Sequence, residues 1–157
     1  MPKMHVTAVP EHVGSRYPAP HDGPCRERRI RRLADAAGLS KFGVNLVTLP
    51  PGVWSSQRHW HSHEEELVYL LEGELVLVTD AGEETMRAGD VVGFAAGTRD
   101  GHHLQNRSGN DAVFLVVGSR HDEDYGEYPD IDLKFTAGRY SGGAGGSFFV
   151  KKDGSPT

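Results

Sequence analysis

Residues 52–73 read GVWSSQRHWHSHEEELVYLLEG and carry polar side chains at alternating positions that suit one face of an extended strand: Gln57, His59, His61 and His63. In a β-strand, side chains at i, i+2 and i+4 project from the same face. A second strand is predicted from Glu66 to Glu72, and the alternation that turns Glu66 inward also turns Val68 and Leu70 inward. Two adjacent strands would therefore direct histidines and a carboxylate at one point.

This combination of side chains favours a transition metal. Neutral imidazole and carboxylate together suit zinc, manganese, iron or nickel, whereas dedicated calcium and magnesium sites use oxygen ligands. More histidines lie downstream in GHHLQN, residues 101–106, between a Gly-rich turn and another apolar strand. Three separated strands would then supply ligand-type residues. The plainer alternative is a polar surface strand whose histidines serve solubility.

The same residues resemble the two signature motifs of the cupin superfamily. The first motif falls on Gly52, His59-Trp60-His61, Glu66 and Gly73, and the second on Gly89-Asp90, Gly97, His102 and Asn106. The resemblance covers residues 43–120, with the motifs in the family's order. It implies an all-β fold, the cupin double-stranded β-helix or jelly-roll barrel. The pattern is also similar to small bacterial cupins often labelled sugar-phosphate-isomerase-like.

The resemblance implies one divalent transition metal (Mn, Fe, Ni or Zn) held by His59, His61, Glu66 and His102. This sequence departs from the family's pattern at three places. The spacer between Gly52 and His59 is one residue longer than usual, Ala95-Ala96 replaces the customary proline before Gly97, and two extra residues precede His102. A register shift of one residue in that loop would make His103 the ligand instead of His102.

Further site residues are predicted around these ligands, each with a plainer alternative. Glu66 and Gln57 are the candidate catalytic residues, although Gln57 also suits an ordinary polar strand position. Arg99 and Asn106 are the candidate substrate-binding residues, although Arg99 also suits a surface loop and Asn106 a turn. Three neighbours of the ligands are expected at the surface or in solvent: His63, Glu64 and Glu65.

The resemblance implies a metal-dependent enzyme acting on a small oxygen-rich metabolite, such as a sugar, a sugar phosphate or a keto acid. The expected chemistry is enolisation of the isomerase, epimerase or lyase type, or dioxygenation at a site that holds iron. The alternative is a cupin that binds a small ligand or a metal without turnover, as a sensor or storage module. A regulator's ligand domain is disfavoured, because no helix-turn-helix pattern accompanies the barrel.

Composition narrows the class of protein. A chain of 157 residues fits one domain, and its net charge of −5 argues against a nucleic-acid binder. The single cysteine, Cys25, is compatible with a reducing cytoplasm. The first residues lack the apolar core of a signal peptide, and no apolar run is long enough to span a bilayer. We expect a cytoplasmic protein with a small-molecule substrate and neither nucleic-acid nor membrane partners.

The single domain, residues 1–157, is divided into three parts. Residues 1–41 are predicted to form an irregular N-terminal arm, because Pro10, Pro18, Pro20 and Pro24 forbid a long helix. Within it, residues 34–39 suit one helical turn, and the five arginines of residues 26–32 are expected to pair with the carboxylates of residues 121–132. Residues 42–120 form the barrel core.

Residues 121–157 make up the acidic segment and a Gly-rich C-terminal tail. The run Ser141-Gly142-Gly143-Ala144-Gly145-Gly146 is interpreted as a linker, in preference to a lid over the barrel. It would lead to a terminal strand at Phe148-Phe149-Val150, because this short apolar run favours a sheet edge.

Period-two patterns predict the barrel strands at residues 44–49, 66–72, 74–80, 84–87, 91–94, 102–106 and 112–119, in addition to the histidine strand. Several are apolar on both faces. If Glu66 faces inward, Leu67, Tyr69 and Leu71 face outward, and Trp60 points away from the histidines. Exposed apolar patches of this kind are unusual on monomers, so the N-terminal arm, the C-terminal tail or a second subunit should cover this face, and we expect a homodimer.

Overall fold

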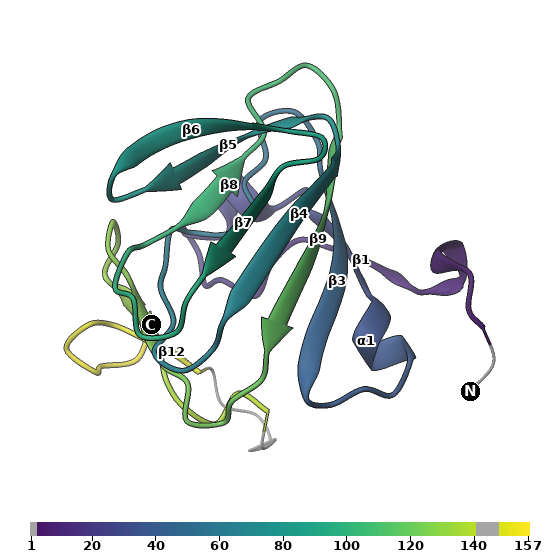
Figure 1. The fold of residues 1–157 in the computed structure, drawn as a ribbon. Helices are drawn as coiled ribbons and strands as arrows, with labels where there is room; N and C mark the ends of the chain where they lie inside the picture. The colour runs from purple at the N-terminus through teal and green to yellow at the C-terminus, as the bar shows by residue number, and fades with distance from the viewer. Residues whose placement is uncertain (1–2, 141–147) are drawn as a thin grey trace.

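The structure, a computed structural model, describes residues 3–140 and 148–157 and is built almost wholly from β-strands (Figure 1). The largest sheet has six strands in the order β1-β2-β3-β9-β4-β7. Their bounds are Glu11–Val13 (β1), Arg29–Arg32 (β2), Phe42–Leu49 (β3), Ala112–Ser119 (β9), Glu66–Glu72 (β4) and Val91–Phe94 (β7). Every pairing between them is antiparallel.

Two smaller antiparallel sheets have three strands each. One has the order β6-β5-β8, with bounds Gly82–Arg87 (β6), Glu74–Thr79 (β5) and His103–Gln105 (β8). The other has the order β10-β11-β12, with bounds Gly126–Tyr128 (β10), Leu133–Phe135 (β11) and Phe149–Val150 (β12). The helical pieces are short: Val6–Ala8 (η1), Gly23–Cys25 (η2) and Leu33–Ala36 (α1).

The hydrophobic core lies where the six-stranded sheet and the β6-β5-β8 sheet meet. One cluster joins Leu49 of β3, Leu70 of β4 and Phe114 of β9 to Leu75 of β5 and Leu104 of β8. Burial of these side chains is the main source of stability, because it removes apolar surface from water. The predicted all-β architecture is confirmed, and so are the period-two strands outside the histidine segment.

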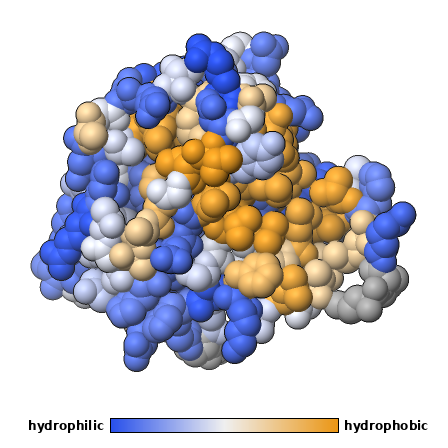
Figure 2. All heavy atoms as spheres, viewed as in Figure 1, coloured by the Kyte–Doolittle hydropathy of each residue, from blue (hydrophilic) through white to orange (hydrophobic). Residues whose placement is uncertain are grey.

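Strand β4 has the predicted alternation. Val68 and Leu70 are buried, whereas Leu67 and Tyr69 are 43% and 39% exposed. Figure 2, drawn in the same view as Figure 1, shows apolar side chains gathered over the outer face of β4, β9 and β3. The exposed large apolar residues of these strands and of β7 are Phe42, Leu67, Tyr69, Val91 and Val117.

Trp60 does not belong to this outer face. Its side chain is only 6% exposed, and Tyr125 packs edge-on against it at 6.1 Å between ring centroids. The backbone N–H of Trp60 also donates to Glu127 O, so the C-terminal segment covers this residue. The expectation that Trp60 contributes to an outward apolar surface is therefore wrong.

The N-terminal arm is more regular than predicted. Strands β1 and β2 pair and extend the large sheet through β3, with Ile30 opposite Val47 and packed against the core. Partial burial of Ile30 stabilises this strand pairing. The prolines of the arm forbid a long helix but do not prevent a strand at residues 29–32. The predicted helical turn is present as α1, and Gly38 follows it with a φ of 73°.

The arginines of residues 26–32 do not pair with the acidic segment. Arg26 pairs with Asp22, Arg29 with Asp111 and Arg31 with Glu11. Strand β2 lies between β1 and β3, so it reaches partners on the arm and on the turn before β9. Two carboxylates of residues 121–132 have other partners: Asp124 pairs with His61 and Arg139, and Asp130 pairs with Arg58.

The C-terminal strand is confirmed as β12, which pairs with β11. Its Phe149 joins Tyr128, Leu133 and Phe135 in a second apolar cluster, against which Tyr17 packs. The Gly-rich run Ser141–Gly146 lies outside the described residues. Among the helices of the described residues, none has both the length and the apolar character needed to cross a membrane.

Candidate metal centre

The histidine segment is not the regular strand that its alternation predicts. Between residues 53 and 65 it makes only isolated bridges, Trp54 with Gln105 and His59 with His102. Its backbone changes partner along its length, because Ser55 N–H donates to Leu104 O while Ser62 N–H donates to Tyr125 O. The segment passes from the β8 side to the C-terminal segment, so no single ladder forms.

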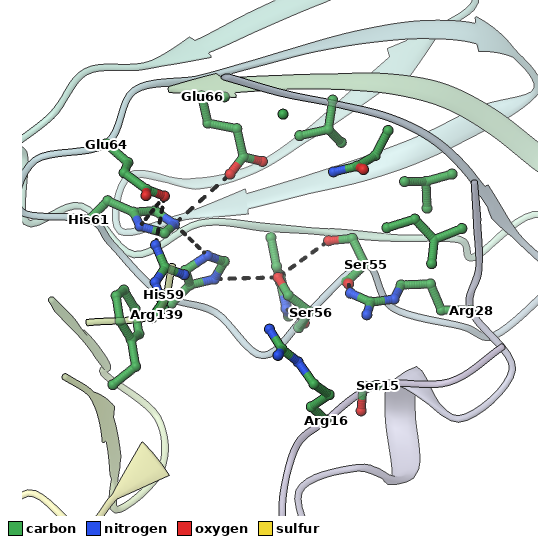
Figure 3. A pocket seen from close by; sticks show the side chains of 18 of the residues that line it. Ser15, Arg16, Arg28, Ser55, Ser56, His59, His61, Glu64, Glu66 and Arg139 are labelled. Carbon is green, nitrogen blue, oxygen red and sulfur yellow. Dashed lines mark hydrogen bonds and ion pairs between the residues drawn. The ribbon is translucent and has the colours of Figure 1, made fainter. Parts of the chain in front are cut away.

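Two of the four alternating side chains nevertheless converge. The Nε2 atoms of His59 and His61 lie 3.1 Å apart, and Glu66 Oε2 lies 4.0 Å from His61 Nε2 (Figure 3). One ligand-type atom from each of these three residues lies within 4.8 Å of the other two. Gln57 instead donates from Nε2 to His21 O, and the exposed His63 stacks on His121.

The hydrogen bonds of these rings determine where their protons lie. Nδ1 of His59 is 2.9 Å from Gln57 O, and Nδ1 of His61 is 2.8 Å from Asp124 Oδ2. A carbonyl or carboxylate oxygen accepts, so each Nδ1 carries a proton, and a ring without a second proton presents a lone pair at Nε2. Two such lone pairs 3.1 Å apart repel each other unless a proton or a metal ion lies between them. The donor set therefore fits a metal ion.

His102 lies beside this group. Its ring centroid is 5.1 Å from that of His59 and 6.5 Å from that of His61, and it stacks on Phe94 at 3.6 Å. Its Nδ1 donates to Asp100 O at 3.3 Å, which again leaves the lone pair at Nε2. That Nε2 is buried and has no hydrogen-bond partner in the part of the chain that the structure describes. A buried polar atom without a partner is costly, and a bound cation would satisfy it.

Both ring nitrogens of His103 already have hydrogen-bond partners. Its Nδ1 donates to Ser56 O at 2.9 Å, and its Nε2 accepts from Gln105 Nε2 at 2.9 Å. Its ring packs edge-on against Trp54, with 4.8 Å between centroids. Of the two adjacent histidines, only His102 therefore presents a free ring nitrogen next to His59.

Burial controls the charge of these rings. Burial first, and then the neighbouring His61 and His102, hold the pKa of His59 well below its usual range. Burial likewise lowers the pKa of His102, although the carboxylate of Glu66 raises it in part. A histidine that stays neutral is in the form that binds a metal ion.

A buried carboxylate that the sequence analysis missed holds His61 in place. Asp124 is 0% exposed, and its Oδ1 accepts from the backbone N–H of His63 at 2.9 Å. Its Oδ2 accepts from His61 Nδ1 and, at 2.6 Å, from Arg139 Nη2. Burial raises the pKa of Asp124, but the hydrogen bonds from His61 and His63 outweigh it and bring the pKa to about 2. The group is therefore a carboxylate at neutral pH.

Glu64 belongs to the same network, and the expectation that it is solvated is wrong. It is 7% exposed, and its Oε2 accepts from Arg139 Nη2 at 2.6 Å. Its Oε1 accepts from the backbone N–H of His121. Arg139 thus neutralises two buried carboxylates from a position after β11, which no spacing rule connects to the histidine motif.

The two predicted substrate-binding residues lie outside the cavity next to the histidines. Asn106 is 1% exposed, donates from Nδ2 to Leu49 O and Asn110 O, and accepts at Oδ1 from Ser108. It closes the turn before β9. Arg99 lies over the ring of Trp60 with its Cζ 5.2 Å from the centroid. Neither residue lines the cavity, and Gln57 does not line it either.

The cavity has a volume of about 680 Å³, which is within the usual range for small-molecule sites. His59, His61 and Glu66 lie on one side of it (Figure 3), and His102 also lines it. A smaller cavity of about 240 Å³ adjoins His61, Phe94 and His102. The N-terminal arm and the C-terminal segment complete the lining, through residues that include Arg16, Tyr17, Tyr128 and Arg139.

The fold is an antiparallel β-sandwich in which histidines and a carboxylate gather at a cavity. This arrangement is typical of β-barrel proteins that hold a small ligand between their sheets. The cupin domain family matches residues 45–118 of this chain. A crystal structure from Silicibacter pomeroyi, described as a sugar phosphate isomerase from a cupin superfamily, is 43% identical, and the match covers 99% of this chain and 96% of that one with a TM-score of 0.89. The chain belongs to the cupin superfamily.

Two further structures are similar over most of the chain. A putative sugar phosphate isomerase from Acidithiobacillus ferrooxidans is 31% identical, with 80% of this chain and 76% of that one covered and a TM-score of 0.71. A polyketide cyclase from Streptomyces resistomycificus is 27% identical, with 76% and 79% covered and a TM-score of 0.63. The comparison with curated proteins gives no match.

Proposed function

We propose that this cupin is a metal-dependent enzyme that acts on a small oxygen-rich metabolite. In this proposal His59, His61, Glu66 and His102 hold one divalent transition metal next to the cavity. The favoured reaction class is enolisation of a hydroxy-carbonyl compound, as in an isomerase, an epimerase or a lyase. Similarity to two proteins described as sugar phosphate isomerases, one of them putative, supports this class.

One observation carries the proposal. His59, His61 and His102 each donate from Nδ1 to an oxygen acceptor, so Nε2 is the nitrogen that each ring can offer to a metal ion. The Nε2 atoms of His59 and His61 lie 3.1 Å apart with a carboxylate oxygen of Glu66 close to them, and Nε2 of His102 is buried without a partner in the described residues. A buried nitrogen without a partner has a cost in free energy, which a bound ion would remove.

When bound, such an ion would act as a Lewis acid on a carbonyl or hydroxyl oxygen of the substrate. The chain's own residues have separate tasks. Asp124 orients His61 and fixes its tautomer, and Gln57 O does the same for His59. Glu66 supplies the negative charge of the site. The apolar surfaces of Phe94 and Phe135 line the cavity near the histidines and limit the access of water.

The test loads the purified protein separately with manganese, iron, nickel and zinc. Each form is offered pools of hydroxy-carbonyl compounds and sugar phosphates, with and without dioxygen, and products are followed by mass spectrometry. The same assays are run on His61→Ala and on His63→Ala. His63 provides a matched control, because it comes from the same segment, is exposed and contacts His121 instead of the other ligands.

We expect about one ion per chain in the wild type and in His63→Ala, and none in His61→Ala. Turnover is expected to fall by several orders of magnitude in His61→Ala alone. Product that forms without dioxygen identifies isomerase, epimerase or lyase chemistry, and product that requires dioxygen identifies an oxygenase. Bound metal with no product in any arm would refute the enzyme proposal and favour a cupin that only binds its ligand.

A further inference from the structure

The wall of the cavity opposite the histidines is rich in arginine. Arg16 and Arg28 come from the N-terminal arm and lie with Ser15 and Ser55 across the cavity from Glu66 and His61, while Ser56 lies beside His59 (Figure 3). Four carboxylates line the cavity: Asp35 pairs with Arg120, Glu64 pairs with Arg139, and neither Glu65 nor Glu66 makes an ion pair with Arg16 or Arg28. The charges of Arg16 and Arg28 are therefore not paired with these four carboxylates.

Arg28 is held by neutral groups. Its Nη1 donates to Ser55 O at 2.6 Å and its Nη2 to Gly14 O at 3.2 Å. These two carbonyl oxygens fix the guanidinium in one orientation and leave its positive charge uncompensated. No carboxylate lies within ion-pair distance of it among the residues that the structure describes.

The guanidinium group of Arg16 packs over an aromatic ring. Its Cζ lies 4.7 Å from the centroid of Phe148, and within residues 3–140 and 148–157 it makes no ion pair. Partial burial first, and then the positive charges of Arg32 and Arg139, lower the pKa of Arg16. A guanidinium placed among like charges on an apolar ring, with no hydrogen bond or ion pair to the residues that the structure describes, is well arranged to receive an anion.

The distance from this wall to the candidate metal centre is short. Arg28 contacts the carbonyl of Ser55, the hydroxyls of Ser55 and Ser56 are 3.5 Å apart, and Ser56 Oγ is 3.4 Å from His59 Nδ1. One small molecule could therefore contact the arginines at one end and the candidate metal centre at the other. The Ser15 hydroxyl is buried and has no partner in the described part of the chain.

We propose that Arg16 and Arg28, with the hydroxyl groups of the neighbouring serines, form a subsite for the phosphate group of a phosphorylated substrate. The proposal rests on the function proposed above and narrows its substrate class to a phosphate monoester that carries a hydroxyl or carbonyl group a few bonds away. Two guanidinium groups match the double negative charge and several acceptor oxygens of a phosphate better than the single charge of a carboxylate.

The test measures binding of inorganic phosphate by titration calorimetry, with acetate as the comparison anion. Phosphate could also reach a bound metal, so the titration is made with the wild type and with His61→Ala, in which the metal centre is disrupted. Arg16→Met is the key variant, because methionine keeps a side chain over Phe148 and Arg16 makes no hydrogen bond among those described. Arg87→Met is the matched control, since Arg87 is 70% exposed on β6 and does not line the cavity.

We expect the wild type and His61→Ala to bind phosphate with a Kd of about 1 mM or tighter. Loss of one charge-assisted contact in Arg16→Met should weaken binding about tenfold or more, and Arg87→Met should leave it unchanged. Arg28→Lys, which keeps the charge but not the fork, should weaken binding less than Arg16→Met. Circular dichroism confirms that each variant is folded.

Equal affinity in Arg16→Met and the wild type would overturn the subsite, as would acetate that binds as tightly as phosphate or a wild type that binds neither anion. These outcomes are independent of the metal centre. Phosphate binding that persists in a protein without bound metal or turnover would support the subsite while the proposed function fails. A metal-dependent enzyme whose affinity for phosphate is unchanged in Arg16→Met would support the proposed function while the subsite fails.

Discussion

Replacement of Asp124 by asparagine should change both the stability of the protein and its affinity for metal. The side chain is fully buried and accepts hydrogen bonds from His61, Arg139 and two backbone N–H groups. An asparagine can keep its oxygen on the backbone N–H groups of His63 and Glu64. Its NH₂ group would then face two donors, His61 Nδ1–H and Arg139 Nη2.

The magnitude follows from the two charge-assisted hydrogen bonds that are lost. Each is worth about 1.5–3 kcal/mol, and Glu64 remains as a partner for Arg139, so the free energy of unfolding should fall by about 3 kcal/mol. The effect on metal follows from the tautomer. To meet an NH₂ group, His61 must present a lone pair at Nδ1 and carry its proton at Nε2. Affinity for zinc or manganese should then fall about 10- to 100-fold.

Urea unfolding followed by circular dichroism gives the first quantity, and titration against a competing chelator gives the second. Glu74→Gln is the control, because Glu74 is 47% exposed and pairs with Arg87 at the surface, where an ion pair is worth at most about 1 kcal/mol. An unchanged unfolding midpoint would refute the energetic argument. A destabilised variant that binds metal as tightly as the wild type would refute the argument that Asp124 sets the tautomer of His61.

Three further predictions concern the ligand set, the packing below it and the outer face. His102→Ala should lower the metal affinity about tenfold or more, whereas His103→Ala should leave it unchanged, because of these two residues only His102 presents a free Nε2. Equal losses of affinity for the two variants in the chelator titration would contradict this. Gly126→Ala should destabilise the fold by about 3 kcal/mol, since the added Cβ would lie 1.9 Å from Trp60 O, whereas Gly109→Ala, with open space around it, should change the urea midpoint little. Light scattering should report a homodimer with a mass of about twice 17.1 kDa, and Leu67→Glu on the apolar face should give a folded monomer. A wild type that is monomeric at micromolar concentration would exclude the dimer.

The sequence allowed prediction of the barrel because its strands are short, apolar and separated by turns. Alternation in β4 placed Val68 and Leu70 in the core correctly, since one face of that strand is buried and a shift of one residue would expose both. It failed between residues 53 and 65, where the backbone changes partner from β8 to the C-terminal segment. Period two describes a strand with one continuous ladder, and this segment has none.

The candidate site was predictable where its residues are close in sequence or belong to the second motif, as His102 does. His59, His61 and Glu66 are close in sequence, and the structure brings their ligand atoms together. Asp124 and Arg139 were missed, because they are 63 and 78 residues from His61 and their importance depends on tertiary contacts. Glu64 was misplaced in solvent for the same reason. A run of acidic residues gives no indication of which carboxylate is buried.

The family match ends at residue 118, yet much of the cavity lining comes from outside it. Arg16 precedes the matched region, while Tyr128, Phe135 and Arg139 follow it. The barrel can thus remain a conservative framework while the two terminal segments diverge to recognise different molecules. Exchange of residues 1–41 and 121–157 between two cupins, with Asp124 kept to hold His61, should transfer substrate preference, which makes these terminal segments the natural place to engineer specificity.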